Sequence, residues 1–594
     1  MKRTARPRSS TFVPRLRRSQ IISTFGPGAI IDTIYDSATI KGLDQWPNPK
    51  TEDRIHDERL QGTLHVEFLY QPPPYVPDAR EDRLPIIKFP KYHHCPKCHQ
   101  LTDDFQVRER RLDGVYCTAC RQVRMVPARF IAACSAGHAQ DFPFREWAHG
   151  GLTACNEQLS MRTSGRSSGL RDINIRCDCG EGRAMEGAFS EDAFSKIGVG
   201  CSGGHPWRAT ASSFCQENLR ALQRGASNFY FSETVSSLSV PPWEGRLAEL
   251  VRRFRALFGG NYPDPGNATH VLMLREVLKQ NEYSGLRVED VLDWVKKANQ
   301  AQQTPRDQHA FKMEEFGAFV REVSSDTDWP RFSVRSAEVA KELSPFVAQV
   351  VLADVLEEVR ALIGFRRIDP WSPDPSDPMG NLVSVREPAV NWLPGVRLTG
   401  EGIFIRFHPQ PLDHWAADPD VVARCRRLED MVLARAKSGK SRPLIPSPRL
   451  LFLHTFSHVV MRQLSLECGY SSGAIRERVF AGYSARAEER EVGGVLIYTG
   501  STDSEGTLGG LVSMGEGETL WRVVRRAVRE AAWCSSDPIC SETRNTGERT
   551  MNLSACHACL FAPETSCEFY NSLLDRQTIV GDLDGRGGFL STLI

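Results

Sequence analysis

The amino-acid sequence predicts a multidomain α/β (α+β) protein with zinc-ribbon-like modules, a helical middle region and a C-terminal α/β zinc-binding domain. Its 594 residues exceed what one hydrophobic core supports, so about two to four domains are expected. Ten of the 17 cysteines lie between Cys95 and Cys215, and five more lie between Cys534 and Cys567. Between these two groups, apolar residues recur at the spacing of helices.

The composition limits the classes of protein that fit. Charged residues make up 25% of the chain and the formal net charge is only +1, so a nucleic-acid surface would be a local patch. Apolar runs stay shorter than the roughly 18 residues that a bilayer span requires. Clustered cysteine pairs in a chain without a secretory leader favour metal binding over disulfides. We therefore expect a soluble protein of the reducing cytoplasm.

Changes in composition divide the chain into six expected segments. Both zinc-binding segments are poor in apolar residues, so a metal is expected to supply part of their stability. The segments are a basic disordered arm at 1–18, a β-rich segment at 19–90, a zinc-binding region with a ribbon and a second Cys/His cluster at 91–220, a mainly helical region at 221–368, a linker and strand segment at 369–448, and a C-terminal zinc-binding domain at 449–594.

The first 18 residues carry seven basic side chains and no acidic one. A transit peptide has this composition, and so does a solvated arm that could touch phosphate; we expect the arm. Ser19 to Tyr35 follows as two short apolar runs on either side of Gly26-Pro27-Gly28. The pattern predicts two strands joined by a structural turn. A phosphate-binding loop is rejected, because no Gly-Lys-Ser/Thr follows and proline removes a donor amide.

Two Cys-x-x-Cys pairs, Cys95 with Cys98 and Cys117 with Cys120, form the strongest single motif of the sequence. Pairs separated by about 15–20 residues are typical of a zinc ribbon, in which each pair lies at a knuckle. Four protein ligands leave no open coordination position. We therefore expect this zinc to stabilise the fold rather than to catalyse a reaction.

A second group of cysteines and histidines extends to Cys215, and more than one ligand set is compatible with it. The motifs CSAGH and CSGGH resemble each other weakly, which suggests one or two further zinc sites. Buried thiols without metal are the alternative. The first choice for one site is Cys177, Cys179, Cys201 and Cys215, which leaves Cys134, His138 and Cys155 without an obvious fourth partner.

Helical periodicity dominates the region from about 225 to 367. The proline-rich stretch 370–378 is expected to be a linker, and 400–409 a buried strand. Two stripes predict core-facing helices: Leu247, Leu250, Val251, Phe254, Leu257 and Phe258, and then Leu352, Val355, Leu356, Val359 and Ile363.

A relaxed Walker A pattern occurs at Ala434-x4-Gly439-Lys440-Ser441. A working phosphate loop needs a strand before it and a helix after it. Here a charged helical segment at about 421–436 precedes the pattern, and three prolines follow it. We therefore reject an ATPase site and expect the chain to have no motor activity of its own.

The C-terminal region contains a predicted helix at 451–478, a buried strand at 494–500 and an amphipathic helix at 519–533. His454 and His458 share one face of the first helix, where packed histidines are expected and a metal site is the alternative. Asp503 and Glu505 follow the strand, so a metal-dependent nuclease using them with His454 is a rival hypothesis.

The amphipathic helix presents four arginines at i, i+3, i+4 and i+7. Such a stripe suits DNA phosphates, and a solvated helix face is the alternative. The expected DNA-binding residues are Arg522, Arg525, Arg526 and Arg529.

The last cysteine cluster follows this helix directly and offers five thiols for four zinc ligands. We expect Cys534 to be the one left over, because it ends the helix and lies farthest from the Cys556-x-x-Cys559 knuckle. The expected ligands are Cys540, Cys556, Cys559 and Cys567.

The residues as a whole resemble the DrmB family, components of the bacterial DISARM anti-phage system. The similarity runs from about Ser19 to Arg576 and is carried by motifs such as SQIISTFGPGAIID, GEGIFIRF, YTGSTDSEGTLGGLV and NLSACHACLFAPETSCE. The C-terminal part is similar to the zinc-binding domain of MrfA-type helicases, and this resemblance implies zinc on four of its cysteines.

The resemblance also implies a function and a partner. It predicts a non-motor subunit that associates with the superfamily 2 helicase DrmA and helps to bind or load phage DNA, either single-stranded or with an overhang. ATP hydrolysis would come from the partner. The rivals are the nuclease described above and a protein-interaction hub that makes no contact with DNA.

Overall fold

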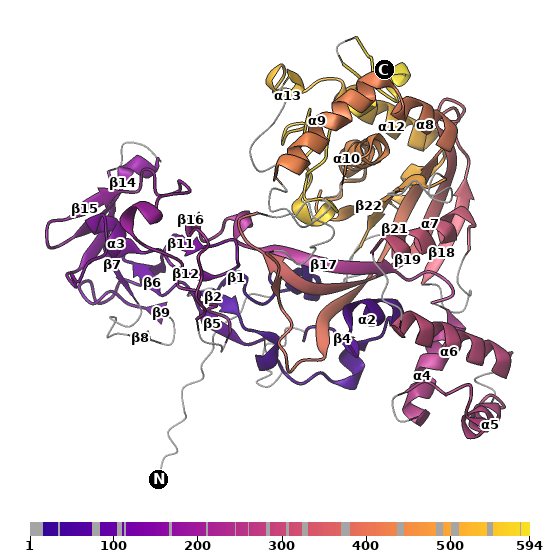
Figure 1. Cartoon of the computed structure of the whole chain (residues 1–594), viewed down its shortest axis with the longest axis horizontal. Helices are drawn as coiled ribbons and strands as arrows, with labels where there is room; N and C mark the ends of the chain where they lie inside the picture. Colours follow the sequence, from indigo (N-terminus) through magenta and orange to yellow (C-terminus); the bar gives the residue numbers. More distant parts are fainter. Residues whose placement is uncertain are drawn as a thin grey trace.

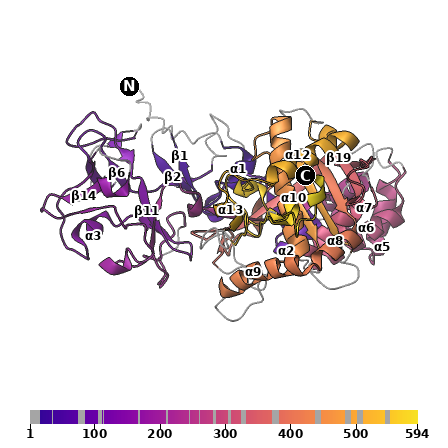
Figure 2. The same cartoon turned by 90° about the horizontal axis from the view of Figure 1, so that it is seen from above.

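The computed structural model describes residues 16–33, 36–73, 84–103, 110–111, 114–164, 169–208, 212–243, 245–258, 261–280, 285–303, 308–323, 331–369, 381–435, 445–482, 491–500, 510–542, 551–582 and 584–594. A lobe of short strands lies at one end of the molecule and a larger lobe of long strands and helices at the other (Figure 1, Figure 2). In these residues, no helix is both long enough and apolar enough to cross a membrane.

The largest sheet of the described residues belongs to the larger lobe. Its strands are β3 (Arg54–Ile55), β4 (Phe68–Tyr70), β17 (Phe231–Leu238), β18 (Phe332–Ala337), β19 (Val347–Arg366), β20 (Val383–Ser384), β21 (Trp392–Phe407), β22 (Ile475–Ala481) and β23 (Gly493–Thr499). The main path runs β17–β19–β21–β23–β22 with antiparallel pairing, and β4 joins β21 in parallel. The sheet thus combines strands from four of the six expected segments.

β19 spans 20 residues where the sequence predicted a helix through Leu352 and Ile363, and that prediction is wrong. The strand pairs with β21 along one edge and with β17 and β18 along the other. Its side chains enter three hydrophobic cores, so most of it is buried on both faces. A strand buried on both faces loses its two-residue alternation, although its five valines favour a strand. The strand predictions at 400–409 and 494–500 are confirmed by β21 and β23.

The N-terminal segment begins with α1 (Arg18–Ser23), so a helix stands where the first strand was predicted. The apolar run contains only two buried isoleucines, Ile21 and Ile22. Because the run is so short, a single helical turn is enough to bury both against the sheet. The turn at Gly26-Pro27-Gly28 is confirmed. Gly28 has a φ of +86°, and a Cβ there would lie 2.9 Å from the Phe365 ring. The strands that follow are β1 (Ile30–Asp32), β2 (Ser37–Ile40) and β5 (Ile86–Lys88), which form one antiparallel sheet.

The smaller lobe holds most of the zinc-binding region. Its strands are β6 (Tyr92–His94), β7 (Gln100–Asp103), β8 (Arg110–Arg111), β9 (Gly114–Val115), β10 (Val126–Pro127), β11 (Phe130–Ala133), β12 (Ala139–Asp141), β13 (Leu159–Thr163), β14 (Ile173–Cys177), β15 (Gly182–Ala184) and β16 (Arg220–Gln223). One sheet has the order β10–β6–β7–β13–β14–β15 and another the order β12–β11–β16. α3 (Phe144–His149) packs on β14 and β15, where Phe142 and Trp147 form part of an aromatic core.

A group of helices flanks the lower edge of the larger lobe in Figure 1. They are α2 (Glu58–Leu64), α4 (Arg246–Phe254), α5 (Ala268–Val277) and α6 (Val288–Gln303). α7 (Gln308–Val320) packs instead on the central sheet, against β17, β19 and β22. The helix predicted over 247–258 is confirmed by α4 and the 3-10 turn Arg255–Phe258 that follows. α4, α5 and α6 share a core of their own around Trp243 and Trp294.

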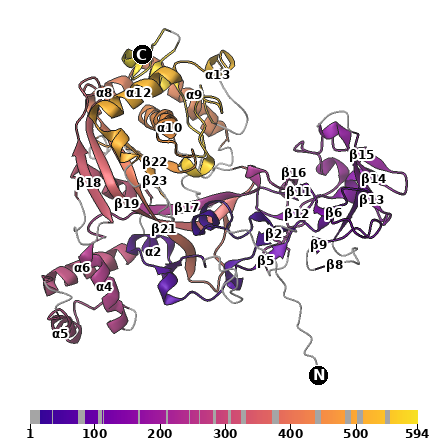
Figure 3. The ribbon, with the colours of Figure 1, turned by 180° about the vertical axis from the view of Figure 1, so that it is seen from behind.

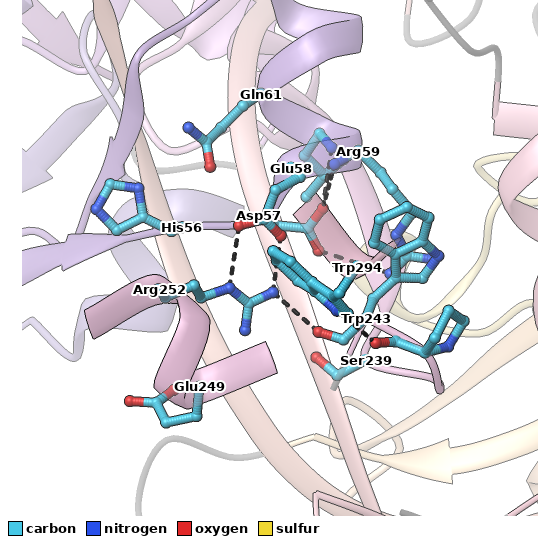
Figure 4. Close-up of polar contacts among 12 residues, drawn as sticks. His56, Asp57, Glu58, Arg59, Gln61, Ser239, Trp243, Glu249, Arg252 and Trp294 are labelled. Carbon is cyan, nitrogen blue, oxygen red and sulfur yellow. Dashed lines mark hydrogen bonds and ion pairs between the residues drawn. The ribbon is translucent and has the colours of Figure 1, made fainter. Parts of the chain in front are cut away.

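A buried ion pair joins α2 to α4 (Figure 4). The Arg252 guanidinium donates to the Glu58 carboxylate from Nε at 3.0 Å and from Nη2 at 2.8 Å, and the Tyr262 hydroxyl donates a third hydrogen bond. Burial acts to raise the pKa of Glu58, but the Arg252 charge and these hydrogen bonds outweigh burial and lower the pKa to about 2. Asp57 caps α2 by accepting the backbone N–H groups of its first turn.

The C-terminal helices cover one face of the central sheet (Figure 3). They are α8 (Pro409–Ala416), α9 (Pro419–Arg435), α10 (Pro448–Cys468), α12 (Gly517–Ala531), α13 (Ile539–Glu542) and α14 (Gln577–Val580). α10 is the most deeply buried of them and packs on β22, β23, α12 and α14. Ser447 caps its N-terminus and Gly469, at φ +71°, ends it, so the helix predicted over 451–478 stops at Cys468 and its last residues belong to β22.

We expect Glu58→Gln to destabilise the fold at neutral pH by about 3–5 kcal/mol, because it removes the charged carboxylate that accepts two hydrogen bonds from the buried Arg252 guanidinium. The folded pKa of Glu58 lies below its unfolded value of 4.5, so its stabilisation is present above that pH and is lost as pH falls towards 2. Urea unfolding at neutral pH and near pH 3 checks this, and the difference from wild type should shrink by about half.

The matched control for this prediction is Glu276→Gln, which removes an exposed partner of Lys279. It should change the free energy of unfolding by less than about 1 kcal/mol at either pH. A Glu58→Gln variant as mild as this control, or equally destabilised at both pH values, would contradict the role of the pair.

Candidate metal centres and nucleic-acid interface

In the described residues, cysteines, histidines and a glutamate form clusters whose donor atoms all lie within 4.8 Å of one another. No described cysteine is in a disulfide, and only Cys425 and Cys468 lie outside these clusters. The clusters are Cys95, Cys98, Cys117 and Cys120; Cys134, His138, Cys201 and Cys215; His149, Cys155, Cys177 and Cys179; Cys534, Cys540, Cys556 and Cys559; and His454, His458, Glu477 and Cys567.

The first cluster is built from two matching knuckles. The N–H of His99 donates to the carbonyl of Cys95, and the N–H of Arg121 donates to the carbonyl of Cys117. Both His99 and Arg121 have positive φ, at 67° and 53°, and they hold equivalent places directly after the second cysteine of each pair. Few apolar side chains support this module beside its cysteines. Its stability therefore depends on what the four thiols bind.

Sulfur separations in the clusters fit zinc. Cys98 Sγ lies 3.5 Å from Cys117 Sγ, and Cys540 Sγ lies 3.8 Å from Cys559 Sγ. Zn–S bonds of about 2.3 Å directed to tetrahedral corners place two sulfurs about 3.8 Å apart. A disulfide needs about 2.05 Å, so these contacts are those of ligands around a shared ion.

The cysteines expected to form one site, Cys177, Cys179, Cys201 and Cys215, belong to two different clusters, which corrects that grouping. Cys201 and Cys215 join Cys134 and His138, which a tight turn with Gly137 at φ +85° brings together after β11.

Cys177 and Cys179 join Cys155 and His149 instead. β13 pairs with β14 so that Leu159 faces Cys177, and this register brings Cys155 Sγ to 3.6 Å from Cys177 Sγ. His149, at the end of α3, lies 3.2 Å from Cys179 Sγ through its Nε2. Sequence reasoning missed His149, although the pair His149-x5-Cys155 has ligand types on both sides of a turn.

In the C-terminal cluster, Cys534 takes the place expected for Cys567, which is a second correction. Cys534 Sγ lies 3.5 Å from Cys556 Sγ. The chain turns back directly after α12, because the N–H of Cys534 donates to the Asp537 carboxylate and the N–H of Asp537 donates to the carbonyl of Cys534. This turn brings Cys534 to the other three cysteines, although Cys534 follows the end of a helix.

Electrostatics in three clusters favour one thiolate each. Hydrogen bonding with Cys559 lowers the pKa of Cys540 to about 6 against the effect of burial, and the charge of Arg576 adds to this. Hydrogen bonding with Cys134 lowers the pKa of Cys201 to about 5. The backbone near Glu181 lowers that of Cys179 to about 7. Because the thiolate is the form that binds metal, a lowered pKa favours zinc binding by these cysteines at neutral pH.

α12 places the four predicted arginines on one exposed face, while its apolar side chains are buried against α10. Arg526 contacts Glu467 at 3.2 Å and Arg522 contacts it at 3.9 Å, but their side chains remain 61% and 58% exposed. Arg525 lies over the Trp521 ring at 5.8 Å. In the described part of the chain, Glu467 is the one carboxylate paired with this face, so the face stays basic.

A groove of about 340 Å³ begins where the arginine face meets the C-terminal cluster. Arg462 and Arg529 line it together with Trp533, whose side chain is 69% exposed, and Cys534 and Cys559 lie along its wall. Sequence reasoning missed Arg462 and Trp533, because only the packing of α10 beside α12 brings them together. Two arginines outnumber the one acidic residue of the lining, Glu530, and together with the Trp533 ring they suit a single strand of nucleic acid.

Of the three residues of the rival nuclease, His454 alone lies in the described part of the chain. Asp503 and Glu505 lie outside the described residues. His454 is completely buried, and its Nε2 faces Glu477 and Cys567.

We expect Cys534→Ala to lose one zinc ion per chain, because it removes a ligand from the C-terminal cluster. The matched control is Cys468→Ala, which removes a half-buried thiol of α10 that belongs to none of the clusters described. Metal analysis of the two purified variants by mass spectrometry checks this. Unchanged zinc content in Cys534→Ala would show that the cluster is grouped differently.

Comparison with known proteins agrees with this architecture. A domain of unknown function, DUF8724, matches residues 17–231, and the MrfA Zn-binding domain matches residues 456–560, which include α12 and the Cys534 cluster. The chain thus carries a zinc-binding domain at its C-terminal side. The DISARM protein DrmB of Bacillus paralicheniformis is 30% identical over 575 residues, which cover 94% of this chain and 98% of that relative. The chain therefore belongs to the DrmB family of DISARM proteins, as its motifs predicted.

Proposed function

We propose that this chain is the non-motor subunit of a DISARM complex that associates in the cytoplasm with the helicase DrmA and helps to bind or load phage DNA. The observation that carries the proposal is the similarity to a DISARM protein over 94% of the chain. The arginine face of α12, set beside a cysteine cluster inside the MrfA Zn-binding domain, supports a DNA-binding role.

The arginine face and the adjoining groove offer two complementary kinds of contact to DNA. Guanidinium groups neutralise phosphates without reading sequence, as a defence protein acting on varied DNA requires. The exposed Trp533 ring offers a stacking surface for an unpaired base. Single-stranded DNA, or a duplex with an overhang, can use both contacts.

Zinc would act on this surface only by holding it in shape. Cys540, Cys556, Cys559 and Cys534 would be its ligands at this site, and zinc bound there supplies a rigid link between the end of α12 and the groove wall. The four ligands of the ribbon, Cys95, Cys98, Cys117 and Cys120, would act likewise in the smaller lobe. In both places four protein donors leave no position for a substrate.

ATP hydrolysis would come from the helicase. The Walker-like residues Gly439 to Ser441 lie outside the described residues, but their flanks do not suit a phosphate loop. α9 ends at Arg435 just before them, where a strand is needed, and α10 begins only at Pro448.

A nuclease built on Asp503, Glu505 and His454 would need His454 to reach an open site, and its complete burial supports the non-catalytic proposal. Cleavage of labelled single-stranded DNA by the purified chain in Mg²⁺ or Mn²⁺, abolished in Asp503→Ala, would overturn that proposal.

We expect the double charge reversal Arg525→Glu and Arg526→Glu to weaken binding of single-stranded DNA at least about tenfold, because two phosphate contacts are lost. The slope of log affinity against log salt should fall by about 1.4, at about 0.7 for each contact. Fluorescence anisotropy with a labelled oligonucleotide over a salt series measures both quantities.

The control pair for this experiment is Lys296→Glu with Lys297→Glu, two adjacent exposed residues on α6, far from α12 (Figure 1). This pair should leave the affinity and the salt slope nearly unchanged. Equal effects of the two pairs would mean that net charge alone acts. Absence of salt-dependent binding by the wild-type chain would favour a protein-interaction hub.

We expect the purified chain to hydrolyse no ATP alone and to co-purify with the helicase DrmA. A mixture of both proteins should hydrolyse ATP in response to DNA, since only the helicase would supply a motor. A steady-state phosphate-release assay on each protein and on the mixture checks this. ATP turnover by this chain alone, removed by Lys440→Ala, would contradict the non-motor assignment.

A further inference from the structure

Four donor side chains from three separate segments meet in the core of the C-terminal domain. His454 and His458 project from α10, Glu477 from β22, and Cys567 follows the 3-10 turn Glu564–Ser566. His454 Nε2 lies 3.1 Å from Glu477 Oε1 and 3.2 Å from Cys567 Sγ, and His458 Nε2 lies 3.5 Å from the same carboxylate oxygen. None of the four is more than 7% exposed.

Hydrogen bonds on the outer side of each imidazole fix which nitrogen carries the proton. His454 Nδ1 lies 3.2 Å from the carbonyl oxygen of Leu573, and His458 Nδ1 lies 2.8 Å from that of Leu560. A carbonyl oxygen only accepts, so both Nδ1 atoms must donate. In the neutral rings, both Nε2 lone pairs therefore point at the cluster centre, as in histidines that bind metal.

The other two donors are held in the same way. Cys567 Sγ accepts backbone N–H groups from Phe569 at 3.3 Å and from Asn571 at 3.2 Å, and these hydrogen bonds hold the sulfur in place. Glu477 Oε1 accepts the N–H of Glu568 at 3.1 Å, and the Ser457 hydroxyl donates to the other oxygen. Each ligand atom is thus oriented by a neighbour outside the cluster.

The four donor atoms cannot satisfy one another by hydrogen bonds, because too few protons lie between them. Two imidazole lone pairs, a carboxylate oxygen and a sulfur converge, and the Cys567 thiol can offer one proton among them. His458 Nε2 makes no hydrogen bond within the described residues, although it is almost completely buried. A buried polar atom without a partner costs free energy, and a divalent cation would satisfy all four donors at once.

We propose that His454, His458, Glu477 and Cys567 form a further metal site, distinct from the all-cysteine site at Cys534, and that it binds Zn²⁺. Two imidazoles, a carboxylate and a thiolate are all zinc ligands, and bonds of about 2.0–2.3 Å give donor separations of about 3.3–3.7 Å. Three contacts between the donors, at 3.1, 3.2 and 3.5 Å, are close to these values, and all four donor atoms lie within 4.8 Å of one another. With four protein ligands, the site is structural.

Its position indicates what the ion would hold together. The ion ties α10 to β22 and to the chain around Cys567, which lies beyond the 456–560 match to the MrfA Zn-binding domain. A cavity of about 410 Å³ between β17 and β22 reaches Glu477 and Cys567 and offers an entry path. The site would therefore fasten the C-terminal domain onto the sheet that carries the rest of the chain.

Native mass spectrometry of the purified full-length chain tests the site, together with His458→Gln and the matched control Cys468→Ala. We expect His458→Gln to hold one zinc ion fewer than wild type and Cys468→Ala to hold the same number. Identical zinc content in wild type and folded His458→Gln would overturn the proposal, whatever happens to DNA binding or helicase association.

Anomalous X-ray scattering at the zinc edge from wild-type crystals decides the matter without any variant, should His458→Gln fail to fold. A peak among the four side chains is the expected result. Density without an anomalous peak there, in crystals that show zinc at the all-cysteine site, would mean that an imidazolium–carboxylate network fills the core instead.

Discussion

Convergence of sulfur and nitrogen donors is the constraint on which this structure depends. In the ribbon, the four thiols have few apolar neighbours, so the hydrophobic effect alone cannot hold two knuckles in register. Segments apart in the chain, such as those of Cys134 and Cys215 or of Cys534 and Cys559, bring their donor atoms close enough to share an ion. Zinc would therefore stabilise the modules that the apolar core does not reach.

The long sheet connects the hydrophobic cores of the larger lobe, whereas the metal clusters connect segments within single modules. β19 and β21 carry side chains into the core of the C-terminal helices and into the core of the N-terminal segment, so the larger lobe is a continuous body. The buried pair of Glu58 and Arg252 then fixes the helical region to that body. The Cys534 cluster and the His454 cluster thus both lie on this continuous body.

This arrangement suits the DNA-binding subunit without a motor that we propose. The exposed arginines of α12 can contact DNA without a conformational change, provided that the orientation of the helix is fixed. The cysteine cluster at the end of α12 fixes that orientation. The groove beside it gains Arg462 from a neighbouring helix and Trp533 from the turn that leads into the metal site. Motion and ATP hydrolysis can then belong to a partner.

The zinc chemistry, the ribbon pairs, the amphipathic arginine helix and the family could be predicted from the amino-acid sequence, because each depends on residue types at short spacing. Three features could not be predicted and depend on the packing of distant segments: Cys534 and not Cys567 joins the last cluster, His149 lies with Cys155, and 347–366 is a strand. Which cysteines and histidines bind the same ion depends on the distances between them in the folded chain, and their spacing in the sequence does not give those distances. A segment buried on both faces likewise shows no periodicity that could distinguish strand from helix.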